Sequence, residues 1–474
     1  MWIKKSYQDW LTGRNTPVPT QLISNEEFCP IPQTEEQRRV EKRLFELADR
    51  HARQLGLSRR DFLKTSGGMA TAFLALNEVF GDIFSVSVAE ALEVDAYREA
   101  WPKNEFIFDA QTHHVKDSIV GPLAFRKLTG KLGLNPELIG IQPTRDDLHR
   151  ANFMKEIFFD SDTVMALISG AAIGPVDKHS ITIEDMIATR ELLNGAAGSQ
   201  RMLSHGIVDP RRPDALEELE RQVKELGIDG FKLYTGNSAA PFMLDDEKIA
   251  YPFLEKSREL GIRNISTHKG LPLGGRGKEF FMPTDIPKVA RDFPEMNFII
   301  YHSGMRDMMA SGPPRKSINA ENQSYIPWTT DLVNARLKDP TMTNVYMELG
   351  GVFGFSAITH PDICGHLLGQ IIGAFGADHV IWGTDCIWWG SPQWLIEAFR
   401  RFQIPEYLQE QYGYAPISAA DKQAIFGRNI ARLYGVDIEA ARKAFPEDAI
   451  SKIKVAYEEA GPEPSNTAYG WVSG

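Results

Sequence analysis

The sequence has little cysteine, no long apolar run and no excess of positive charge. Three cysteines, Cys29, Cys364 and Cys386, occur in 474 residues, and none forms a Cys-x-x-Cys pair. Their spacing argues against a disulfide framework and against a thiolate zinc site. No apolar run reaches the roughly 18–20 residues that a membrane-spanning helix needs. The net charge of −11 argues against nucleic acid or an anionic membrane surface as the main partner.

What the chain does contain is an ordinary globular composition, with 43% hydrophobic and 24% charged residues. From residue 105 onward, short apolar runs alternate with helical stretches such as 213–227, 247–260, 284–293 and 363–376. The predicted strands are 105–109, 163–168, 201–205, 229–234, 263–267, 297–302, 344–348 and 379–384. Eight strands that alternate with helices predict an α/β fold, a (β/α)8 TIM barrel.

Four of these apolar runs end in residues that bind metals or transfer protons. The first run leads into Asp109-Ala110-Gln111-Thr112-His113-His114, and the others lead into His268, His302 and Asp385. The carboxyl ends of all barrel strands face one mouth, so these side chains are expected to converge there. Imidazoles and a carboxylate at one mouth predict a metal site for hydrolysis or decarboxylation.

The first 104 residues are predicted to form an N-terminal helical extension. Residues 1–34 are rich in Pro, Asn, Thr and Gln and are expected to be irregular, and 35–56 is an amphipathic pattern that predicts a helix. Residues 58–64 resemble a twin-arginine export signal, 69–76 a short hydrophobic region and 89–91 a cleavage site, so 58–91 is a signal-like segment. The alternative is a helix capped by Ser58. Periplasmic export and cytoplasmic retention of the extension both stay open.

Several motifs in residues 105–435 are similar to the amidohydrolase superfamily, in its aminocarboxymuconate semialdehyde decarboxylase-like branch. The motifs are Asp-x-Gln-x-His at 109–113, Gly-Phe-Lys-Leu-Tyr at 230–234, His268, Phe-Pro at 293–294 with Tyr-His-Ser-Gly at 301–304, Trp-Gly-Thr-Asp at 382–385, and Gly-Arg-Asn-Ile-Ala-Arg-Leu-Tyr-Gly at 427–435. The resemblance implies a TIM barrel enzyme. The residues that follow, 436–474, are predicted from their own pattern to form a C-terminal helical tail. The resemblance also implies a homo-oligomer, expected to be a dimer.

The same resemblance implies roles for the residues at the barrel mouth. His113, His268 and Asp385 would hold one divalent metal ion, Zn or Mn. Gln111 stands where the family usually has a histidine, and its neutral amide oxygen is a poorer ligand, weakly bound or outside the first coordination sphere. Asp385 would also move a proton. His302 would polarise the reacting oxygen or orient the attacking water.

Other residues are predicted to contact a small-molecule substrate. Lys232 ends the apolar run of the fourth strand and His205 ends the third strand, while Glu348 ends the seventh. Arg276 lies in the glycine-rich loop 270–283, which is predicted to be a mobile lid that binds an anionic group of the substrate. Trp388 and Trp389 would stack on an aromatic or apolar ring. The alternatives are a packing or ion-pair role for Lys232, a solvated loop, and tryptophans packed on a partner subunit or on the extension.

Together these observations predict a metal-dependent hydrolase acting on a C–N, ester or lactone bond of a small cyclic or aromatic carboxylate. The main alternative is non-oxidative decarboxylation of an aromatic acid by the same residues. A third hypothesis is a barrel that binds a ligand without catalysis, and only Gln111 supports it.

Overall fold

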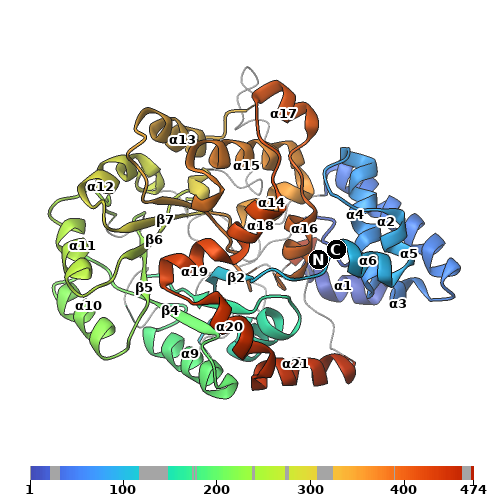
Figure 1. Ribbon diagram of the computed structural model, residues 1–474, viewed down its shortest axis with the longest axis horizontal. Helices are drawn as coiled ribbons and strands as arrows, with labels where there is room; N and C mark the ends of the chain where they lie inside the picture. The colour runs from blue at the N-terminus through green and yellow to red at the C-terminus, as the bar shows by residue number, and fades with distance from the viewer. Residues whose placement is uncertain are drawn as a thin grey trace.

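The computed structural model describes residues 2–21, 33–116, 148–172, 176, 179–236, 241–272, 277–306, 324–388, 390–461 and 471–473. A parallel barrel surrounded by helices makes up most of the molecule, and a group of helices from the N-terminal part lies on one side of it (Figure 1). Among the described residues no helix combines the length and apolarity that crossing a membrane requires.

Eight parallel strands follow one another around the barrel in chain order. They are β2 (Phe108–Thr112), β3 (Met165–Ile168), β4 (Met202–Gly206), β5 (Gly230–Tyr234), β6 (Asn264–His268), β7 (Asn297–Tyr301), β8 (Val345–Glu348) and β9 (Val380–Ile381). Backbone hydrogen bonds between β2 and the segment after β9 close the circle, from Ala110 N to Trp382 O (3.0 Å) and from Asp385 N to Gln111 O (2.9 Å). The predicted TIM barrel is confirmed.

The first strand starts three residues later than its apolar run predicts. Asp109 and Gln111 lie inside β2 and are buried. The Asp109 carboxylate accepts hydrogen bonds from the backbone N–H and the hydroxyl of Thr384 (3.1 and 2.5 Å). Thr384 is distant in sequence from Asp109. The sequence alone therefore placed the polar residues Asp109 and Gln111 at or after the end of the strand, and not inside it.

Helices cover the outside of the barrel, and four of them match the predicted helical stretches. The helices are α8 (Arg150–Met154), α9 (Ile183–Ala197), α10 (Ala215–Lys224), α11 (Ala250–Glu259), α12 (Ile286–Asp292), α13 (Thr329–Lys338), α14 (Val352–Thr359), α15 (Pro361–Phe375), α16 (Gln393–Arg401), α17 (Glu406–Tyr412), α18 (Ala419–Gln423), α19 (Asn429–Tyr434), α20 (Ile438–Ala444) and α21 (Ala449–Glu459). Side chains alternate along each strand: Phe231 packs outward on Phe253 of α11, with ring centroids 5.0 Å apart, whereas Lys232 points into the barrel.

The N-terminal extension consists of β1 (Trp2–Lys4), α1 (Lys5–Thr12), α2 (Glu35–Gln54), α3 (Arg59–Leu63), α4 (Ser66–Phe80), α5 (Val88–Leu92) and α6 (Val94–Ala100). The expectation that residues 1–34 are irregular is wrong for β1 and α1. β1 pairs antiparallel with β10 (Trp471–Ser473) at the other end of the chain. A local sequence pattern does not predict a pairing between segments so far apart.

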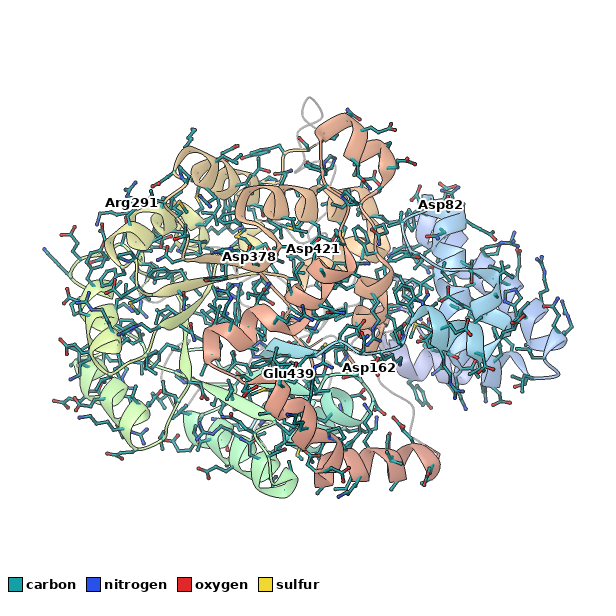
Figure 2. The ribbon with its side chains drawn as sticks, viewed as in Figure 1. Asp82, Asp162, Arg291, Asp378, Asp421 and Glu439 are labelled. Atoms are coloured by element: carbon teal, nitrogen blue, oxygen red, sulfur yellow. The ribbon has the colours of Figure 1, made fainter. Side chains whose placement is uncertain are left out.

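The extension lies beside α16 (Figure 1), and buried charged residues connect the two. Arg401 is fully buried, and its guanidinium bonds Glu90 of α5 at 2.6 Å and lies over the Trp101 ring at 4.7 Å. The neighbouring Arg400 bonds Asp162, which Figure 2 shows near this interface, at 2.5 Å. A buried cation is tolerated only when it is paired in this way, so the extension and the barrel depend on each other.

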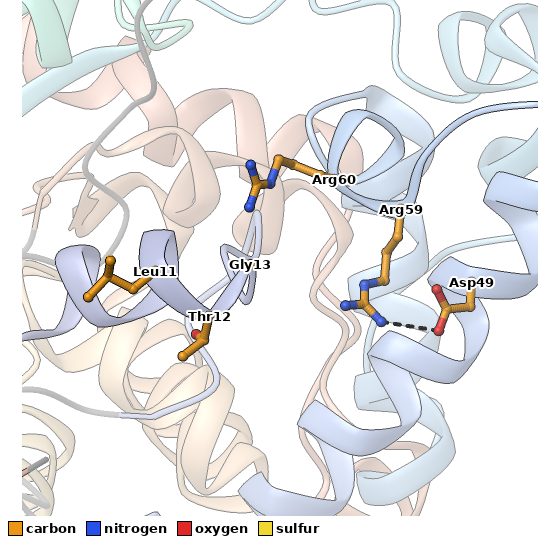
Figure 3. A pocket seen from close by; sticks show the side chains of 6 residues that line it. All are labelled: Leu11, Thr12, Gly13, Asp49, Arg59 and Arg60. Atoms are coloured by element: carbon orange, nitrogen blue, oxygen red, sulfur yellow. Dashed lines mark hydrogen bonds and ion pairs between the residues drawn. The ribbon is translucent and has the colours of Figure 1, made fainter.

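The twin-arginine-like segment is folded into the extension. The Ser58 hydroxyl accepts the Asp61 N–H at the start of α3, and Phe62 is completely buried. Arg59 forms an ion pair with Asp49 at 3.1 Å, and with Arg60 it lines a cavity of about 470 Å³ beside Gly13 (Figure 3). The local geometry is that of the capped helix, and the cellular location stays a prediction.

Candidate functional site

Four of the predicted residues lie at the carboxyl ends of the strands, in two contacting pairs. His113 Nε2 is 3.0 Å from Asp385 Oδ1, and His302 Nε2 is 3.2 Å from His268 Nδ1. All four side chains are buried, with Asp385 the most exposed at 9%. The barrel therefore brings residues from β2, β6, β7 and β9 to one place, as the strand-end pattern predicts.

In the first pair, a backbone carbonyl fixes the orientation of His113. His113 Nδ1 lies 2.7 Å from Ser169 O, and since a carbonyl only accepts, Nδ1 carries the hydrogen. Nε2 therefore faces the Asp385 carboxylate either with a second proton or with a lone pair. Burial raises the pKa of Asp385, but the hydrogen bond and the charge of His113 outweigh it and hold this pKa below its usual value. A buried carboxylate needs a hydrogen-bond donor or a positive charge beside it, and the Gln111 amide donates to Asp385 Oδ1 at 2.9 Å.

In the second pair, backbone carbonyls also fix the orientations of the imidazole rings. His268 Nε2 lies 3.1 Å from Leu271 O and His302 Nδ1 lies 2.8 Å from Gly350 O, so these two nitrogens carry the hydrogens. Burial lowers the pKa of His302 to about 4 and the pKa of His268 well below its usual value. Near neutral pH both rings are neutral, and their lone pairs face each other at 3.2 Å. Facing lone pairs repel unless a cation lies near both.

His302 sits on a backbone turn that Glu348 holds in place. The φ angles of His302 and Ser303 are 60° and 48°, in the left-handed region that costs side-chain-bearing residues about 1–3 kcal/mol each. The Glu348 carboxylate accepts the backbone N–H groups of His302 (3.0 Å) and Gly350 (2.5 Å). Burial raises the pKa of Glu348 to about 8. The only sequence signal for Glu348 was its place at the end of the seventh strand.

Lys232 and His205 lie deeper in the barrel. The Lys232 ammonium nitrogen is 3.2 Å from the centre of the Tyr301 ring, and among the residues that the structure describes it has no hydrogen-bond partner. Burial lowers the pKa of Lys232 well below its usual value. His205 uses Nδ1 on the Ser169 hydroxyl and Nε2 on the Tyr434 hydroxyl, both at 2.7 Å, so neither nitrogen is left for a substrate.

Aromatic rings surround the second pair and approach the first. Tyr234 stacks on His268 with centroids 4.6 Å apart, and the Phe281 ring meets His268 edge-on at 5.4 Å. The Trp388 ring lies 6.0 Å from His113, which agrees with its predicted place at the mouth. The other two predicted substrate contacts, Arg276 and Trp389, lie outside the described residues.

Sequence reasoning missed the ion pair that anchors Phe281. Lys269 directly follows His268, is fully buried, and bonds Asp285 Oδ2 at 2.7 Å and Phe280 O at 2.9 Å. This contact holds η5 (Lys278–Phe281) against the site. The sequence signal for this ion pair was Lys269, a charged residue immediately after a buried strand.

The candidate metal ligands do not form a closed cage. Within the described part of the chain, no three His, Cys, Asp or Glu side chains are grouped closely enough to enclose an ion. The donors come as two pairs, with the Gln111 amide beside the first pair. Each imidazole turns one nitrogen inward and gives its other N–H to a backbone carbonyl, which is how metal-binding histidines are commonly oriented.

A family model described as Amidohydrolase matches residues 156–436, more than half of the chain. Solved structures that are similar include 5-carboxyvanillate decarboxylase from Sphingomonas paucimobilis (16% identity, TM-score 0.45, 70% of this chain and 99% of that chain). A putative 2-pyrone-4,6-dicarboxylic acid hydrolase from Pseudomonas putida has 16% identity and a TM-score of 0.44 over 70% of this chain and 99% of that chain. A manganese-bound dihydroxybenzoic acid decarboxylase from a Polaromonas species has 18% identity and a TM-score of 0.39 over 70% and 97%. No curated protein matches.

Proposed function

Because this chain belongs to the amidohydrolase family, we propose that it is a metal-dependent hydrolase of a C–N, ester or lactone bond in a small cyclic or aromatic carboxylate. The observation that carries the proposal is the ionised Asp385 carboxylate at the barrel mouth, 3.0 Å from an imidazole whose other nitrogen is already engaged. Such a carboxylate can accept a proton from water.

His113, His268 and Asp385 would hold one divalent ion, Zn or Mn, with Gln111 beside them. His302 joins this set because its Nε2 lone pair faces His268. A bound divalent ion would polarise the substrate carbonyl and lower the pKa of a water molecule. Since the donors lie in two pairs, we expect ion binding to draw the pairs together.

The two candidate reactions require opposite starting states of Asp385. In hydrolysis, Asp385 takes a proton from the attacking water and passes it to the leaving group. In decarboxylation, the same residue would have to deliver a proton to the ring carbon, which requires a protonated acid. Asp385 Oδ1 accepts a hydrogen bond from Gln111 Nε2 at 2.9 Å, as expected of the proton acceptor that the first role requires.

The tautomer of His302 narrows its proposed role. Its Nδ1–H is donated to Gly350 O, and its Nε2 carries a lone pair near neutral pH. A nitrogen of this kind accepts a hydrogen bond and cannot stabilise a developing oxyanion. We therefore assign His302 to orienting water or the ion, and not to polarising the reacting oxygen.

The aromatic surroundings support a flat substrate. Trp388, Tyr234 and Phe281 lie next to the imidazoles and offer faces and edges on which a ring can stack. Lys232 packs on Tyr301, which supports its packing role more than a contact with a substrate carboxylate. We further propose that residues 105–435 form the catalytic unit, with 1–104 and 436–474 packed on it.

The test is turnover of a substrate panel by metal-loaded protein, with Asp385→Asn and the exposed control Asp82→Asn. The panel contains lactones, esters and anilides of benzoic acids, together with hydroxybenzoic acids. Product formation with uptake of water, lost in Asp385→Asn and kept in Asp82→Asn, is the expected result. Release of carbon dioxide from a hydroxybenzoic acid would overturn hydrolysis in favour of decarboxylation. No turnover by folded, metal-loaded protein would favour the non-catalytic hypothesis.

A further inference from the structure

Phe281 lies beside the carboxyl ends of β5 and β6, at the barrel mouth. Its ring meets the His268 ring edge-on, with centroids 5.4 Å apart, and the side chain is only 1% exposed. An added Cβ on Gly236, two residues after β5 ends, would lie 1.9 Å from Phe281 Cε2. The absence of a side chain at Gly236 therefore gives the phenylalanine ring its place beside His268.

Hydrogen bonds from the ends of two strands hold the backbone of η5. Phe280 O accepts the Thr235 hydroxyl at 2.7 Å and the Lys269 ammonium group at 2.9 Å. Phe281 O accepts the Gly270 N–H at 2.9 Å. Thr235 follows β5, whereas Lys269 and Gly270 follow β6. Since two consecutive carbonyl groups are tied to both strands, the Phe281 ring cannot leave His268 without breaking these hydrogen bonds.

A ring that is fixed in this way separates ligands by size. A mobile side chain makes room for a larger ligand, whereas a fixed and closely packed ring excludes any group that needs the same space. In an apolar pocket, one additional methylene group is typically discriminated by about 10–200-fold in kcat/KM. A fused second ring is larger than a methylene group, so a discrimination of at least this size is expected.

We propose that Phe281 determines the size of the substrate: it admits a single-ring group beside His268 and excludes a fused two-ring group. The inference rests on the proposed function only in placing the substrate next to the imidazoles at the mouth, and it requires no bound ion. The phenylalanine ring fills the volume that a second fused ring would enter. Phe281→Ala removes one six-membered ring and should leave room for another, since engineered apolar cavities in proteins bind benzene.

The experiment is calorimetric titration of the purified protein with benzamide and 2-naphthamide, which share one polar group and differ by one fused ring. Both probes are neutral, so the Asp385 carboxylate does not repel them. We expect the wild type to bind benzamide at least about tenfold more tightly than 2-naphthamide. Phe281→Ala should bind 2-naphthamide as tightly as benzamide or more tightly. Thr235→Val removes one hydrogen bond from η5 and should reduce the wild-type preference in part.

Phe253→Ala is the matched control. Phe253 is also a phenylalanine that is 1% exposed, and it packs on Phe231 outside the barrel, with ring centroids 5.0 Å apart. Loss of this ring should lower the stability of the protein and leave its preference for benzamide unchanged. If Phe281→Ala does not fold, the smaller change Phe281→Leu takes its place and should also reduce the preference.

Equal preferences in the wild type and in the Phe281 variants would overturn the inference. A wild type that binds 2-naphthamide as tightly as benzamide, or that binds neither probe, would overturn it as well. Hydrolysis of methyl benzoate, measured in parallel, tests the proposed function separately. Hydrolysis without a change of preference in Phe281→Ala would refute the size limit alone, whereas the expected preference without any hydrolysis would count against the proposed hydrolase and support the size limit.

Discussion

Removal of the Glu348 carboxylate is expected to release the turn that carries His302. The carboxylate accepts two buried backbone N–H groups, from His302 and Gly350, and Gly350 O in turn fixes the His302 ring. In Glu348→Ala both donors lose their partner. The left-handed backbone at His302 and Ser303 then loses the contact that holds it.

The size of the effect follows from these two hydrogen bonds. A buried donor left without a partner costs about 1–3 kcal/mol, so two cost about 2–6 kcal/mol of unfolding free energy. This is a large part of the roughly 5–15 kcal/mol that stabilises a typical domain. Glu348→Gln keeps one acceptor oxygen and is expected to lose about half as much. The exposed Glu439→Ala on α20 should change stability by less than about 0.5 kcal/mol.

Urea unfolding of the ion-free proteins, followed by tryptophan fluorescence, measures the free energy of unfolding. Steady-state kinetics measures kcat and KM. Glu348→Gln should fold and lose kcat more than KM, because a displaced His302 affects the reaction more than substrate binding. If Glu348→Ala unfolds at the wild-type urea concentration and retains its kcat, Glu348 does not position His302.

Two further perturbations address the buried charges. The pKa of His302 is lowered to about 4 in the folded protein, so the unfolded chain binds more protons between pH 6.5 and 4. Stability should be fully present above pH 6.5 and fall as pH drops toward 4, by up to about 3 kcal/mol from this group. His302→Gln should flatten the pH dependence of the urea midpoint, and an unchanged slope would contradict the assignment. Arg401→Met leaves Glu90 buried without its cation and should cost about 3–5 kcal/mol, measured by urea unfolding against exposed Arg50→Met. Resistance of the extension to limited proteolysis should fall in Arg401→Met, and wild-type resistance would show that the interface does not depend on this ion pair.

The barrel could be predicted from the sequence because its strands are buried on both faces and read as continuous apolar runs. The same reason put His268, His302 and Asp385 at the mouth, since each follows such a run. The predicted position of β2 was wrong by three residues because Asp109 and Gln111 are polar. Their partners, Thr384 and Asp385, lie more than 270 residues away in sequence.

The details that decide the chemistry depend on contacts across the barrel. Which nitrogen of His302 faces inward is set by Gly350 O after the next strand, and that of His113 by Ser169 O. The pairing of β1 with β10 and the burial of Arg401 under Glu90 join segments with no shared local pattern. Hydrophobic periodicity carries no information on such contacts.

The most direct test of the central claim is anomalous X-ray diffraction from crystals loaded with Mn²⁺ and, separately, with Zn²⁺. The account predicts one strong peak at the barrel mouth, contacted by His113, His268 and Asp385, and its loss in His268→Ala. No peak at the mouth in crystals of active protein, or a peak bound by other residues, would contradict the proposed metal site.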